Sequence, residues 1–208
     1  MFPIVIPHHN RHDLLKTCLE SIPKGYPVYI ISGGTFAENC NKGFQLVKEE
    51  AVFFLNDDTI VNALALSEAE KRLEKADIIG INQVSQDGSP LFIGVRVQGS
   101  SYWPFTLVKK KELADFPSGA AFLIKTKLFK ELNGFNERFK NGAEDVDLFL
   151  RAIELKAKID YTNASITHFL SQSDGRWEFT DQNVSIFWTY FKPQRLEILF
   201  PDRDIGLS

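Results

Sequence analysis

A pair of neighbouring aspartates follows a short apolar run in the first third of the chain. Residues 53–55 read Phe-Phe-Leu, and Asn56, Asp57 and Asp58 come next. Adjacent carboxylates repel each other, and a hard divalent cation with oxygen ligands relieves that repulsion. Asn56 and Asp58 are two residues apart, so on an extended chain both side chains point the same way. The segment is a candidate metal site, with an ordinary Asx-rich turn as the alternative.

A second acidic group opens a segment with an apolar helical face. Glu144 and Asp145 follow Gly142 and begin this segment, which we expect to be helical over residues 144–156. Carboxylates in a first helical turn are stabilised by the helix dipole by about 0.3–1 kcal/mol each, which alone can explain them. A carboxylate held ionised at a helix start and facing a cleft also suits a general base. Both interpretations stay open at this point.

One histidine, two tryptophans and a run of three lysines are further candidates for ligand contacts. His168 stands among β-prone neighbours, where an imidazole is either structural or a metal ligand. Trp103 and Trp177 lie in irregular polar segments, where aromatic rings either stack on sugars or anchor a core. The lysines at 109–111 favour a solvated face over a docking site for an anionic acceptor.

The elements that must position these groups alternate between strand and helix in the first half of the chain. This alternation predicts βαβ units around a mostly parallel sheet. The expected strands are 2–6, 28–31, 51–55 and 78–81, and the expected helices are 13–22, 36–48 and 63–76. The first two strands are expected to be buried. Ligands bind beyond the carboxyl ends of such strands, and the acidic turn follows the third strand there.

The second half is less regular. Expected strands are 91–97 and 120–125, with short extended pieces at 159–161 and 165–167. We expect Thr126 to be the N-cap of a short helix ending at Asn133-Gly134, and a final helix over about 181–191. No repeat or linker is evident, so one domain over residues 1–208 is predicted.

Composition excludes several classes of protein. The chain has 208 residues, of which 44% are apolar and 25% charged, as in ordinary globular domains. The net charge of −3 gives no strong nucleic-acid signal, and no apolar run is long enough for a transmembrane helix. Cys18 and Cys40 each fall inside an expected helix, which favours reduced thiols. We expect a cytoplasmic protein, with peripheral membrane attachment as the alternative.

A series of short motifs, taken in order, resembles glycosyltransferase family 2, especially its bacterial rhamnosyltransferase-like members. The motifs are residues 4–10, 15–22, 36–43, 54–59, 118–122, 133–135, 144–148 and 166–169. The resemblance implies an α/β GT-A-type fold, with a mostly parallel central sheet, flanking helices and a Rossmann-like nucleotide-binding half. Residues 1–80 would bind the nucleotide sugar, and residues 81–208 would bind the acceptor and carry the base.

The resemblance also implies roles for individual residues. Asp58 and His168 would bind Mn²⁺ or Mg²⁺, and Asp145 would be the catalytic base with Glu144 beside it. The expected substrate contacts are Pro7, His8, Arg11, Ser32, Gly33, Asn41, Asp57, Ser118, Gly119 and Trp103. In this set Pro7 and the 8–11 loop would face the nucleotide. Asn41 would lie near the diphosphate or donor sugar, and Asp57 near the ribose or the phosphates.

Two positions depart from the family pattern. The family carries an aspartate after its second strand to hold the nucleotide base, whereas this chain has Ser32-Gly33-Gly34. The base contact then falls to Ser32 or to backbone groups. Asn56 stands where the first aspartate of the metal-binding motif would be. Neither change removes the expected metal ligand or the expected base.

The implied reaction is inverting, metal-dependent transfer from a nucleoside diphosphate sugar to an acceptor hydroxyl. We expect a UDP- or dTDP-sugar donor and a glycan or glycolipid acceptor. A nucleotidyltransferase would begin with a glycine-rich phosphate loop, which the segment 7–10 lacks. The other alternative is a non-catalytic nucleotide-sugar or glycan-binding module. The missing base-binding aspartate favours that module, while the presence of Asp58, Asp145 and His168 together favours an enzyme.

Overall fold

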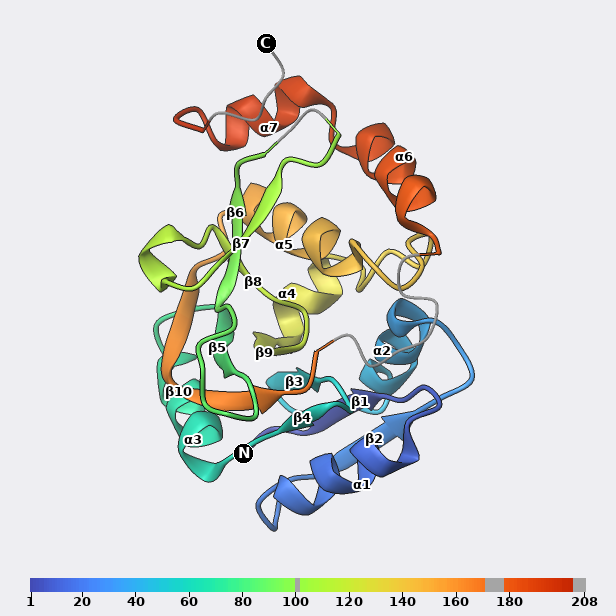
Figure 1. The fold of residues 1–208 in the computed structure, drawn as a ribbon, viewed down its shortest axis with the longest axis vertical. Helices are drawn as coiled ribbons and strands as arrows, with labels where there is room; N and C mark the ends of the chain where they lie inside the picture. Colours follow the sequence, from blue (N-terminus) through green and yellow to red (C-terminus); the bar gives the residue numbers. More distant parts are fainter. Residues whose placement is uncertain (100–101, 171–177, 204–208) are drawn as a thin grey trace.

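The computed structural model describes residues 1–99, 102–170 and 178–203, and these form a mixed α/β fold around a curled central sheet (Figure 1). The strand order is β2-β1-β3-β9-β5-β10-β4. Their bounds are β1 Ile4–Pro7, β2 Val28–Ile31, β3 Ala51–Leu55, β4 Thr59–Ile60, β5 Ile78–Val84, β9 Ala121–Lys125 and β10 Ile159–His168. The β2, β1, β3, β5 and β10 strands run in one direction. The β9 strand lies antiparallel between β3 and β5, and β4 is antiparallel to β10.

Helices cover both faces of this sheet because its strands carry apolar side chains on both faces. On β3, Phe53 and Leu55 belong to the apolar cluster that packs against α1 and α3, while Val52 and Phe54 belong to the cluster on the other face. The helices of the first face are α1 His12–Ser21 and α3 Ala63–Arg72; those of the second are α2 Phe36–Phe44, α4 Thr126–Glu131 and α5 Glu144–Glu154.

A smaller antiparallel sheet adjoins the second face. It has the order β7-β6-β8, with β6 Gly94–Val97, β7 Phe105–Val108 and β8 Phe116–Pro117. A 3₁₀ turn at Lys111–Leu113, helix α6 Thr180–Tyr190 and helix α7 Pro193–Leu199 complete the fold. Phe187 of α6 is fully buried and packs against Phe105 of β7, with ring centroids 5.1 Å apart. This contact joins α6 to the smaller sheet.

Three expectations from the sequence need correction. The β2 strand is not buried: it forms an edge of the large sheet, and Ile30 is 44% exposed. Thr126 is not the N-cap of α4. Lys125 takes that position, and the Thr126 hydroxyl instead donates to the Glu49 carbonyl at 3.0 Å. The two extended pieces expected at 159–161 and 165–167 are one strand, β10, with a shift of register between Tyr161 and Ser165.

Other expectations are confirmed. The third strand has the predicted bounds, and the remaining expected helices are present, with bounds that differ by a few residues. Cys18 and Cys40 are buried, unpaired thiols within α1 and α2. No helix in the described part of the chain is both long and apolar enough to span a bilayer.

Candidate functional site

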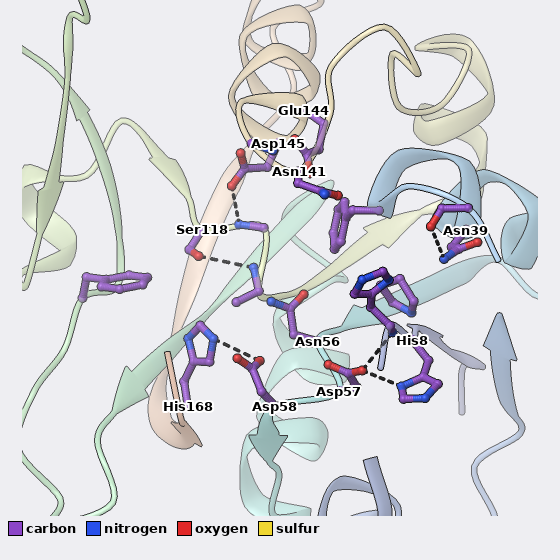
Figure 2. Close-up of a pocket in the computed structure, with 18 residues that line it drawn as sticks. His8, Asn39, Asn56, Asp57, Asp58, Ser118, Asn141, Glu144, Asp145 and His168 are labelled. Carbon is purple, nitrogen blue, oxygen red and sulfur yellow. Dashed lines mark hydrogen bonds and ion pairs between the residues drawn. The ribbon is translucent and has the colours of Figure 1, made fainter. Parts of the chain in front are cut away.

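A cleft lies beyond the carboxyl ends of β1 and β3, below the first turn of α5 (Figure 2). It is lined by Pro7, His8, His9, Gly34, Phe36, Asn39, Asn56, Asp57, Asp58, Phe92, Ser118, Gly119, Ala120, Asn141, Gly142, Glu144, Asp145 and His168. The backbone N–H of Asn56 donates to the Ala120 carbonyl at 2.8 Å, which continues the β3–β9 ladder. This bond brings the 118–120 segment beside the acidic turn.

Asp145 stands at the start of α5 and is half-buried. Its Oδ2 accepts a hydrogen bond from the Gly119 N–H at 2.8 Å, and its Oδ1 accepts one from the Val146 N–H at 2.9 Å. Both bonds fix the orientation of the carboxylate at the N-terminus of α5. A Cβ at position 119 would lie 2.6 Å from the Cβ of Asp145, so only glycine allows this approach.

Glu144 is buried and shapes the turn that precedes Asp145. Its Oε2 accepts a hydrogen bond from the Gly142 N–H at 2.6 Å. Asn141 and Ala143, on either side of Gly142, both have left-handed backbone conformations, with φ of 51° and 70°. Glu144 lines the cleft beside Asp145, as predicted, and its carboxylate is engaged with the backbone of this turn.

Asp58 and His168 face each other at the other end of the cleft (Figure 2). The register of β10 with β4 pairs His168 with Thr59, and the Phe169 N–H donates to the Asp58 carbonyl at 2.9 Å. His168 Nδ1 lies 2.7 Å from Oε1 of the buried Gln83, and it must donate because a carbonyl oxygen only accepts. Nε2 of the same ring faces Asp58 Oδ1 at 3.2 Å, and in the neutral form of the ring it presents a lone pair there.

This arrangement suits a divalent cation. Within the described part of the chain, Asn56 Oδ1, Asp58 Oδ1 and His168 Nε2 are buried and have no hydrogen-bond partner. Buried acceptors without partners are unfavourable, and a cation satisfies them. No cluster of three or more His, Cys, Asp or Glu side chains with metal-binding potential occurs among the described residues. These three atoms are fewer ligands than Mg²⁺ or Mn²⁺ takes, so water or substrate oxygens would have to complete a cation site here.

Asp57 points away from Asp58 and holds the loop that follows β1. Its Oδ2 accepts from His8 Nδ1 at 2.7 Å and from the His9 N–H at 3.3 Å. Burial raises the pKa of Asp57, while the hydrogen bonds from His8 and His9 oppose that shift. His8 Nε2 lies 3.1 Å from His12 Nδ1, which extends the chain of polar contacts into α1. The loop after β1 is thereby fixed to the acidic turn.

Nine of the predicted site residues line the cleft, and five do not. Those that line it are Pro7, His8, Asp57, Asp58, Ser118, Gly119, Glu144, Asp145 and His168. Ser32 and Gly33 line a second hollow that shares His8, His9 and Gly34 with the cleft. Arg11 is not in the cleft lining, and its guanidinium pairs with Asp13 at 2.8 Å.

The structure places Asn41 and Trp103 outside the cleft lining. The Asn41 amide donates to the Phe135 carbonyl and accepts from the Phe135 N–H, each at 2.9 Å, so it fixes the turn after α4. Trp103 packs against Phe105 and Phe187, with ring centroids 4.9 and 5.4 Å apart. These contacts match the core-anchor alternative for the tryptophan. Trp177 lies outside the described residues.

Asn39 lines the cleft, although the sequence did not identify it as a site residue. It stands on α2 two positions before Asn41, about 200° away around the helix, so only one of the two can face the cleft. Its Nδ2 donates to the Gly34 carbonyl at 3.0 Å, and its buried Oδ1 has no hydrogen-bond partner among the described residues. Asn39 follows Phe36 by three residues, and residues at this spacing lie on the same face of a helix. Because Phe36 also lines the cleft, this spacing is the sequence feature that could have identified Asn39.

Comparisons with known proteins agree with this fold. Residues 27–185 match the family described as glycosyltransferase like family 2. No curated protein sequence matches the chain. Staphylococcus aureus TarS is 14% identical, with 94% of this chain and 41% of TarS covered and a TM-score of 0.59. A shorter TarS structure, in complex with UDP, is 14% identical, with 89% of this chain and 64% of that one covered and a TM-score of 0.57.

A second set of similar structures comes from Drosophila β1,4-galactosyltransferase 7. Its catalytic domain, in complex with xylobiose, is 14% identical over 86% of this chain and 78% of the other, with a TM-score of 0.54. A mutant of that enzyme was solved with manganese, UDP-Gal and xylobiose; it is 13% identical with the same coverage and a TM-score of 0.56. At such identities the likeness establishes the GT-A fold alone.

Proposed function

The chain belongs to glycosyltransferase like family 2, and on this premise we propose that it transfers a sugar from a nucleoside diphosphate sugar to an acceptor hydroxyl, with inversion. One observation carries the proposal. A single cleft has a carboxylate at a helix N-terminus, Asp145, at one end and the facing pair Asp58 and His168 at the other. The first group suits a base, and the second suits a cation that binds a diphosphate.

The donor end of the cleft is the end with the acidic turn. We propose that a UDP- or dTDP-sugar lies there, with its nucleoside toward the hollow lined by Ser32 and Gly33. Among the described residues, no carboxylate side chain lines that hollow, so the base would contact Ser32, backbone groups or the rings of His9 and His12. The complexes of TarS with UDP and of the galactosyltransferase with UDP-Gal support a uridine nucleotide.

We propose that Asp58 and His168, with the amide oxygen of Asn56, hold Mn²⁺ or Mg²⁺. The structure that contains manganese with UDP-Gal supports this for the fold. When bound, such a cation neutralises the charge that develops on the diphosphate leaving group. Gln83 keeps the His168 ring in the tautomer that presents Nε2 to the site.

Asp145 acts on the acceptor. Its carboxylate takes the proton of the acceptor hydroxyl while that oxygen bonds to the anomeric carbon, and the bond from that carbon to the diphosphate oxygen breaks. A single displacement from the opposite face inverts the anomeric configuration. The hydrogen bonds from Gly119 and Val146 hold the carboxylate in place without protonating it. We propose a glycan or glycolipid acceptor, which the xylobiose complexes of the galactosyltransferase support.

The test is calorimetric titration with UDP-, GDP- and dTDP-sugars, with and without Mn²⁺. We expect one donor class to bind in a metal-dependent way, and Asp58→Ala to lose that dependence. A matched control is Asp13→Ala, which removes an exposed carboxylate outside the cleft lining. Absence of binding by any donor in either metal state would contradict the proposal and favour a non-catalytic glycan-binding module.

A further inference from the structure

The turn before α5 contains two residues in the left-handed backbone region, which asparagine adopts readily and alanine does not. Asn141 and Ala143 have φ of 51° and 70°, and neither is glycine. In this left-handed region the Cβ crowds the following carbonyl oxygen, so such residues persist where the surroundings hold them. Ala143 is also the N-cap of α5 and offers no side-chain cap. The position of the first turn of α5 therefore depends on contacts from outside the turn.

Asn183 of α6 supplies two of those contacts, and the Glu144 carboxylate adds its hydrogen bond from the Gly142 N–H. The Asn183 Oδ1 accepts from the Lys140 N–H at 3.0 Å, and the Asn183 Nδ2 donates to the Lys140 carbonyl at 2.9 Å. The two bonds match both polar groups of one backbone residue, so the orientation of the amide is determined. Asn183 is 5% exposed, and a Cβ at Gly142 would lie 3.4 Å from its Nδ2. The turn thus packs directly on this side chain.

The helix that carries Asn183 is itself firmly attached. Val184 and Phe187 of α6 are buried, and the Asn183 N–H donates to the Phe179 carbonyl at 2.8 Å. The Trp188 indole N–H donates to the Tyr102 carbonyl at 3.1 Å, which ties α6 to the segment before β7. The amide of Asn183 is therefore presented from a rigid element, as a positioning contact requires.

We propose that Asn183 is a positioning residue for Asp145, an inference that rests on the proposed function. Asn183 is not part of the cleft lining, and it acts through the turn at 140–143, which contributes Asn141 and Gly142 to the cleft wall. The turn sets where α5 begins and hence where Asp145 meets Gly119. Asp58 lies in the turn between β3 and β4, and His168 is the last residue of β10, so neither is carried by the 140–143 turn that Asn183 contacts.

Two variants separate positioning from stability. Asn183→Ala removes both hydrogen bonds, and Asn183→Asp keeps the acceptor but loses the donor to the Lys140 carbonyl. The matched control is Gln182→Ala, which removes an exposed amide from the same helix. We expect both Asn183 variants to lower kcat by about tenfold to a hundredfold, because small misplacement of a reacting group is costly. Donor KM and Mn²⁺-dependent donor binding should stay within about twofold, since the metal end is untouched.

Hydrogen–deuterium exchange gives a readout that does not need the reaction. In folded Asn183→Ala and Asn183→Asp protein, the amides of the 140–143 turn should exchange faster than in the wild type and in Gln182→Ala. Wild-type kcat in both Asn183 variants, or unchanged exchange in this turn, would overturn the inference. If the wild type transfers no sugar, the proposed function fails. The exchange experiment still decides whether Asn183 holds the 140–143 turn in place. Thermal unfolding of each variant confirms that the folded protein is being compared.

Discussion

The backbone N–H of Gly119 donates to Oδ2 of Asp145 at 2.8 Å, and an added Cβ at Gly119 would lie 2.6 Å from the Cβ of Asp145. Gly119 follows Ser118 just before β9, whereas Asp145 opens α5. The close approach therefore links the sheet to the first turn of the helix. Because Asp145 approaches position 119 so closely, only glycine fits there.

Gly119→Ala should damage both stability and transfer. The added methyl group displaces the first turn of α5, as in overpacked cores, so we expect unfolding free energy to fall by about 1–3 kcal/mol. Transfer should fall further than stability explains, because Asp145 moves with the helix. Urea unfolding and steady-state kinetics measure the two effects.

Gly88→Ala is the control for this change. Gly88 has a φ of 82° and open space around its Cβ position, so alanine there introduces strain without a collision. It is also outside the cleft lining. We expect lower stability with unchanged kcat. Equal loss of transfer in both variants would show that the Gly119–Asp145 contact has no special role.

Asp58→Asn should separate stability from metal binding. In the metal-free protein, Asp58 Oδ1 and His168 Nε2 are 3.2 Å apart, and with a neutral imidazole both atoms are acceptors. An asparagine amide at this position supplies a donor, so we expect the metal-free variant to be more stable by about 0.5–1.5 kcal/mol. Thermal unfolding in EDTA measures this gain. The variant should also show little further stabilisation by Mn²⁺ with donor, whereas the wild type should be stabilised. A less stable metal-free variant would contradict this account of the pair.

Stability should fall in alkaline solution because two thiols are buried. Burial raises the pKa of Cys18 to about 12 and raises the pKa of Cys40 well above its usual range. Unfolded thiols ionise near pH ~8.5, so their contribution is present below that pH and is lost as pH rises toward the folded-state pKa values. Urea unfolding at about pH 7, 8.5 and 10 should show the decline. A Cys18→Ala, Cys40→Ala double variant should decline less steeply, and an equal slope would exclude the thiols as its cause.

Much of the fold follows from local sequence pattern. The apolar run at 51–55 and the helical periodicity at 144–156 predict elements that the structure contains. The exposure of β2 could not be predicted, because an apolar run does not reveal whether a strand lies at the edge of a sheet. The β7 strand lies between the expected strands 91–97 and 120–125, and its pairing with β6 comes from tertiary context.

The candidate site divides in the same way. Asp58, Asp145 and His168 have chemistry that the sequence displays, and the structure brings all three to one cleft. Asn39 and Asn41 are chemically alike, and only the rotation of α2 decides which one faces the cleft. The contact between Asn183 and the 140–143 turn could not be predicted from local sequence, because the Asn183 side chain bonds to backbone groups of Lys140, 43 positions away.

The central claim is that Asp145 is the base of an inverting transfer, and Asp145→Asn tests it most directly. Asparagine keeps the shape and an oxygen for the Gly119 N–H but takes no proton at neutral pH. With the donor and acceptor that the wild type uses, transfer should fall by about a hundredfold to ten-thousandfold, while calorimetric donor binding with Mn²⁺ stays unchanged. Transfer at the wild-type rate would contradict the account.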